Sequence, residues 1–165
     1  MSDKETFLAA FDSEHAKTMQ VLHAYPADKS ELKPSPNLKS ARELAFVFAL
    51  ERGLGLKVWH DAFANGMPSG GFPQSPETWN EVLAAIDKMH ADFRALVASA
   101  PDEAFDEEVT FFVGPKTMGK VKRIDWLWFI LMDEIHHRGQ FTIYSRIAGG
   151  KVPALYGPSA DEPWF

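Results

Sequence analysis

The segment "IDWLWFILMDEIHHRGQFTIYSRI" (residues 124–147) has the length and the periodicity of a bundle helix. Gly149 and Gly150 follow it as signals that end a helix. Its first part, "WLWFILM" (126–132), is apolar on every side. This composition predicts either the most buried helix of the fold or a helix whose outer side meets another subunit.

Three earlier segments also show helical periodicity. The first covers about residues 4–24, the second follows Ser40 and continues to residue 63, and the third follows Ser75 as N-cap and Pro76 as first helical residue. Four helices of this length predict an all-α protein, a four-helix bundle with long connections, formed by a single domain over residues 1–165. In the last connection, "VTFFV" (109–113) is predicted to be a short extended piece.

The C-terminal tail, residues 149–165, is rich in proline and glycine. It also holds three aromatic residues, Tyr156, Trp164 and Phe165, which are unusual in a free linker. We therefore expect the tail to pack on the bundle.

Composition excludes several classes of function. The formal net charge of −6 argues against a general nucleic-acid binder. The chain has no cysteine, which removes disulfides, thiolate nucleophiles and cysteine-based metal sites. The N-terminus lacks the pattern of a signal peptide, and residues 126–132 are too few to span a bilayer. These observations predict a soluble, cytoplasmic protein without nucleic-acid or membrane partners.

A helical wheel of residues 124–147 places Asp133 and His137 on one face, a turn apart. His136 lies on the flank of that face, whereas Glu134 and Arg138 lie on the opposite flank. The face is otherwise apolar and aromatic, with Trp126, Ile130, Phe141 and Tyr144. An aspartate and a histidine are thus predicted to point together into the core.

Two other helices each offer an inward polar side chain, His15 in the first and Glu51 in the second. Burying charge is costly unless the charge is paired or ligates a metal, and bundle cores do hold carboxylate and histidine ligands. We therefore predict a metal site formed by His137, Asp133 and His15, with Glu51 or His136 as substitutes. Simpler interpretations stay open: His15 as a hydrogen-bonded core residue, Glu51 at the edge of its stripe, and Asp133–His137 as a structural pair.

The stretch "DEIHHRGQFTIYSRIAGGKVPALYG" (133–157) resembles the C-terminal signature of the DinB-like family of bacterial four-helix-bundle proteins, and "ARELAFVFALE" (41–51) resembles that family's second-helix motif. The resemblance implies three histidines around one divalent metal, nickel or zinc. His137 matches the last of these ligands. Asp133 stands where the other fourth-helix histidine is expected, and Val47 stands where the second-helix histidine is expected.

The resemblance implies a divalent-metal-dependent enzyme of hydrolase or thiol-transferase type, with a partly altered set of ligands. The alternative is a non-catalytic bundle that has lost the metal and acts in small-molecule binding or protein interaction. A metal-free acid–base enzyme that uses Asp133 and His137 is a third interpretation. In each case we expect a homodimer formed through an apolar helix face, and a small molecule as ligand.

Overall fold

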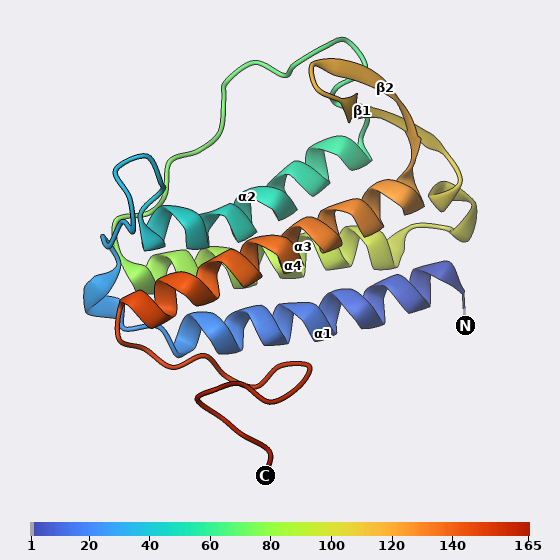
Figure 1. Ribbon diagram of the computed structural model, residues 1–165. Helices are drawn as coiled ribbons and strands as arrows, with labels where there is room; N and C mark the ends of the chain where they lie inside the picture. Colours follow the sequence, from blue (N-terminus) through green and yellow to red (C-terminus); the bar gives the residue numbers. More distant parts are fainter. Residues whose placement is uncertain (1) are drawn as a thin grey trace.

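A computed structural model describes residues 2–165 and confirms the predicted four-helix bundle (Figure 1). The long helices are α1 (Asp3–His23), α2 (Ala41–Trp59), α3 (Trp79–Ser99) and α4 (Arg123–Ile147). The other elements are the 3-10 helices η1 (Ala27–Lys29) and η2 (Asp102–Phe105) and the strands β1 (Glu108–Gly114) and β2 (Thr117–Lys122). Within residues 2–165, no helix combines the length and the apolar composition that crossing a membrane requires.

The order of the helices around the bundle differs from their order in the chain. α1 packs against α3 and α4, and α2 packs against the same two helices, so α1 and α2 lie diagonally. The connection between α2 and α3 runs back along the length of the bundle, and these two helices therefore point the same way (Figure 1). Because α4 lies between α1 and α2, its two sides can bring side chains of three helices together.

Helix starts follow local capping. Ser40 was predicted as an N-cap, and its hydroxyl does accept from the backbone N–H of Glu43 in a capping box. The predicted start of α3 was wrong by a few residues. Thr78, rather than Ser75, caps this helix, because the carboxylate of Glu81 three residues later completes a capping box with it.

The second helix ends earlier than predicted. It ends at Trp59 instead of residue 63, and Asp61 adopts a left-handed backbone conformation with φ of 51°. The Asp61 side chain accepts a hydrogen bond from the backbone N–H of Thr110 in β1. The turn after α2 is therefore tied to the hairpin.

The segment predicted to be extended forms an antiparallel hairpin with the residues that follow it. Val109 pairs with Val121, and Phe111 pairs with Gly119. Val109 and Phe111 are buried, and the Phe111 ring packs edge-on against Trp126 of α4. The alternation of buried and exposed positions in β1 thus closes one end of the bundle.

The C-terminal tail packs on the bundle, as predicted, although Tyr156 is the one residue of its three aromatics that makes a hydrogen bond there. Val152 is buried, and the Tyr156 hydroxyl hydrogen-bonds to Glu14 of α1. Trp164 and Phe165 are exposed. The tail runs beside α1 (Figure 1). Tyr156 contacts α1 through a hydrogen bond of its hydroxyl.

Candidate metal centre

Glu51 from α2 and the pair Asp133 and His137 from α4 converge in the bundle. One ligand-capable atom from each lies within 4.8 Å of the other two. His137 Nδ1 is 2.6 Å from Glu51 Oε1 and 3.8 Å from Asp133 Oδ2. The two α4 residues share a face because they are one turn apart. The structure therefore brings together three of the five residues predicted for a metal site.

The electrostatics of this trio are dominated by the burial of Glu51. Burial raises the pKa of Glu51 to about 7, the hydrogen bond with His137 opposes the shift, and the carboxylate of Asp133 adds to it. The same hydrogen bond raises the pKa of His137. The second oxygen, Glu51 Oε2, is buried without a hydrogen-bond partner among residues 2–165. A buried carboxylate with one unsatisfied oxygen is unfavourable unless a further positive group meets it.

These residues fit a divalent cation. Two carboxylates and an imidazole offer oxygen and nitrogen donors, which zinc, nickel and related first-row metals accept. Two negative charges beside a neutral imidazole balance a charge of +2. The side chains of His137 and Asp133 are 23% and 40% exposed, so a ligand can approach from solvent. Three protein ligands with one accessible side are typical of catalytic rather than structural sites.

The structure does not bring His15 to this trio. His15 Nε2 lies 3.0 Å from Asp87 Oδ1, and the His15 ring stacks on His90 of α3 with centroids 3.8 Å apart. His15 therefore belongs to the contact between α1 and α3, and the interpretation of a hydrogen-bonded residue describes it better. His136 points outward, with Nε2 2.7 Å from the side-chain amide of Gln140.

The interpretation of Glu51 as an edge residue was wrong, since its side chain is only 9% exposed and faces α4. Val47, which stands where the family resemblance places a histidine, lies one turn earlier on the same helix. The carboxylate of Glu51 thus reaches His137 from a position one turn away from the expected one. Because Val47 and Glu51 are four residues apart and lie on one face of the helix, the sequence could have indicated Glu51 as the replacement ligand.

A buried polar network lies behind the trio, and the helical wheel missed it. Glu134 was placed on a flank, yet its Oε1 accepts hydrogen bonds from Thr18 Oγ1 at 2.7 Å and Arg52 Nη2 at 2.9 Å. The Arg52 and Glu134 side chains are 2% and 3% exposed. Arg52 also donates to the carbonyl of Phe48. This ion pair links α2 to α4 through the residues adjacent to Glu51 and Asp133.

Arg138 was also placed on a flank and is buried as well. Its guanidinium donates to the Glu14 carboxylate at 2.5 Å, to the Glu14 carbonyl, and to the hydroxyls of Thr18 and Tyr156. α4 therefore buries two faces, one toward α2 and one toward α1. The signal was the matching i,i+4 spacing of Glu134 and Arg138 on α4 with Glu14 and Thr18 on α1.

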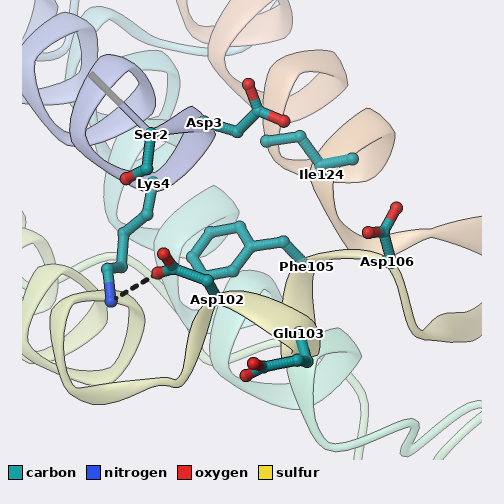
Figure 2. Close-up of a pocket in the computed structure, with 8 residues that line it drawn as sticks. All are labelled: Ser2, Asp3, Lys4, Asp102, Glu103, Phe105, Asp106 and Ile124. Atoms are coloured by element: carbon teal, nitrogen blue, oxygen red, sulfur yellow. Dashed lines mark ion pairs between the residues drawn. The ribbon is translucent and has the colours of Figure 1, made fainter.

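A pocket away from the trio lies where η2 meets the starts of α1 and α4 (Figure 2). Its cavity volume is about 350 Å³. The described lining residues include four carboxylates and no imidazole, and Lys4 pairs with Asp102 at 2.9 Å. Figure 2 shows the carboxylates of Asp3, Glu103 and Asp106 pointing in different directions. This pocket lacks the convergent donor set of the trio, which remains the candidate metal centre.

Comparison with known proteins finds a family whose model covers almost the whole chain. The family described as the DinB family matches residues 1–164. An uncharacterized protein of Bacillus subtilis (strain 168), YrdA, is 29% identical over 120 residues, which cover 66% of this chain and 69% of YrdA.

Solved structures share the fold. A DinB-like protein from Bacillus cereus ATCC 10987 superposes with a TM-score of 0.74 at 20% identity, covering 92% of this chain and 97% of that one. YfiT from Bacillus subtilis gives a TM-score of 0.64 at 14% identity, covering 90% of this chain and 89% of YfiT. YfiT is described as a probable metal-dependent hydrolase with an unusual four-helix bundle topology.

Proposed function

Because the chain belongs to the DinB family, we propose that it is a divalent-metal-dependent hydrolase whose metal ligands are Glu51, Asp133 and His137. The observation that carries this proposal is the convergence of the three donors within 4.8 Å, with one oxygen of Glu51 buried and unsatisfied. The description of YfiT as a probable metal-dependent hydrolase supports the same reaction class. The alternative activity is that of a thiol transferase. It would need a thiol from the substrate because the chain has no cysteine.

The metal would supply Lewis acidity at the accessible side of the trio. Glu51 would hold it from the buried side, and the Arg52–Glu134 ion pair would fix α2 against α4 behind Glu51. Asp133 and His137 would hold it from α4, where their spacing of one turn fixes the distance between their donors. Asp133, the most exposed of the three, lies where a substrate would approach.

Metal analysis and activity together test this proposal. Untagged protein incubated with zinc, nickel or manganese and then desalted should retain close to one equivalent. It should hydrolyse at least one member of a panel of esters, amides and phosphoesters in a chelator-sensitive way. A parallel panel with a low-molecular-weight thiol tests transfer.

The matched variants are His137→Gln, which removes a ligand, and His136→Gln, which changes the exposed neighbour. Only the first should lose metal and activity. Retention of less than about a tenth of an equivalent by the wild-type protein would refute the proposal, since a functional site binds far more tightly. That result would favour the non-catalytic bundle.

We also propose that two copies associate through the outer face of α4. Phe129, Met132 and Ile143 are exposed on this helix at intervals that place them along one seam with His136. Gly139 lies between them with open space where a Cβ would be, which permits a close approach. Light scattering should give a dimer mass for the wild-type protein and a monomer mass for Met132→Glu. A monomeric wild-type protein at micromolar concentration would contradict the dimer.

A further inference from the structure

An apolar cavity lies between α2, α3 and the connection 60–78, away from the trio. Its volume is about 360 Å³, which is within the range of about 300–1,000 Å³ that small-molecule sites occupy. None of Glu51, Asp133 and His137 lines it. The floor is made of apolar side chains of α2 and α3, with Phe72 and Pro73 of the connection as a roof; the floor residues are Phe46, Ala49, Leu50, Gly53, Leu54, Ala85 and Met89.

Gly53 helps to form this space. Two glycines lie close together in α2, and both weaken the helix relative to alanine. Gly55 is required by packing, because a Cβ there would lie 2.7 Å from the Phe93 ring. Packing does not require a glycine at position 53, because the nearest atom to a Cβ there would be Met89 Sδ at 3.9 Å. The missing side chain of Gly53 instead gives the cavity its depth.

The roof is a thin cover carried by the connection. Phe72 is 60% exposed although it lines the cavity. The two residues before it, Gly70 and Gly71, have positive φ values of 103° and 64°. A smaller cavity of about 30 Å³ continues beneath the same cover and shares Leu54, Lys57 and Phe72 with the first. The two cavities therefore adjoin at these three residues.

The charges around the cavity are of one sign. Lys57 and Lys88 line it, and none of the described lining residues is a carboxylate. Lys88 Nζ lies 2.5 Å from Asp92 Oδ2, so the charge of Lys88 is already paired. We propose that this cavity binds a small unbranched aliphatic carboxylate, a medium-chain fatty acid, with its chain on the Gly53 floor and its carboxylate at Lys57. An apolar cavity that adjoins a second one, with a lysine shared by both, is complementary to an aliphatic chain that ends in a carboxylate.

Titration calorimetry with decanoate, below its micelle concentration, tests this site. Decanoate should bind with a stoichiometry of one, and the amide signals of α2 and α3 should shift in a nitrogen–proton correlation spectrum. Gly53→Leu fills the floor and should weaken binding at least about tenfold, since it displaces several buried methylenes. Gly53→Ala, the matched control, leaves the cavity open and should stay within about twofold of the wild-type protein.

The charge is tested separately. Lys57→Met should weaken decanoate binding about twofold to fivefold, as expected for an exposed ion pair, and Lys151→Met should not change it. Decanol, which has the same chain without the charge, should bind the wild-type protein as weakly as decanoate binds Lys57→Met. Absent binding, or equal affinity of the wild-type protein and Gly53→Leu, would overturn the proposal. Concentration-dependent shifts of the same amides without decanoate would also overturn it, because they would identify a second copy of the chain as the occupant.

Discussion

Replacing Glu134 by glutamine would remove one charge from the buried network with almost no change of shape. In the folded protein Arg52 and Glu134 are 2% and 3% exposed and 2.9 Å apart. Glu134→Gln leaves the Arg52 guanidinium buried, with the Phe48 carbonyl still bound but without the carboxylate that balanced its charge. Breaking one side of a buried ion pair costs about 3–5 kcal/mol. For a chain of this size, that corresponds to a decrease in Tm of about 6–20 °C.

Urea unfolding followed by circular dichroism measures this difference. Asp92→Asn is the control, because Asp92 pairs with Lys88 on an exposed part of α3 and should change stability by less than about 0.5 kcal/mol. The double variant Arg52→Met/Glu134→Leu removes both charges and should recover much of the loss. A Glu134→Gln protein within about 1 kcal/mol of the wild-type stability would refute the conclusion that this pair is a closed, desolvated contact.

Two further predictions concern the contact between α1 and α3 and the packing of α2. Burial lowers the pKa of His90, which binds Asp12 and stacks on His15, from 6.5 to about 4. As the pH falls, the unfolded chain therefore binds a proton at this histidine before the folded chain does. The contribution of His90 to the free energy of unfolding is fully present above pH 6.5. The free energy of unfolding should decrease by about 1–2 kcal/mol from pH 7 to pH 5. In His90→Phe, the urea midpoint should depend less on pH between pH 7 and pH 5 than in the wild-type protein. An unchanged pH dependence would contradict the conclusion that His90 causes it. Gly55→Ala should cost about 1–3 kcal/mol, because its Cβ would lie 2.7 Å from the Phe93 ring, and a neutral effect on the urea midpoint would show that Phe93 moves without strain.

The fold could be predicted from the helical periodicity of the sequence and from the residues that begin and end helices. Helix α4 was located from its apolar composition and its terminal glycines, and α2 from the capping box at Ser40. The start of α3 was wrongly predicted at Ser75, since serine and threonine can both cap a helix and residue type alone does not distinguish Ser75 from Thr78. The carboxylate of Glu81, three residues after Thr78, decided it.

The site was predictable only in part. The wheel correctly paired Asp133 with His137, because their relation lies within one helix. It could not show which face of α1 meets α4, since this depends on how the helices are arranged around the bundle. Glu14 and Thr18 face α4, and His15 therefore faces α3.

The charged residues of α4 show a related limit of the wheel. Glu134 and Arg138 were placed on a flank of the inward face, because a single helix does not reveal that a partner helix offers matching charges. A helix packed between two neighbours has two buried faces, and its second face can be polar when every charge on it is paired. Glu134 and Arg138 thus join the polar network, and Asp133 and His137 belong to the candidate metal centre.

Anomalous diffraction from crystals grown with zinc, recorded above and below the zinc absorption edge, tests whether Glu51, Asp133 and His137 bind a metal. One anomalous peak per chain is expected within coordination distance of Glu51, Asp133 and His137, about 2.0–2.2 Å from each donor atom. The same peak should be absent from crystals of His137→Gln. Well-ordered wild-type crystals with a direct His137–Glu51 hydrogen bond and no peak at this position would contradict it, and would leave the trio as a buried structural contact.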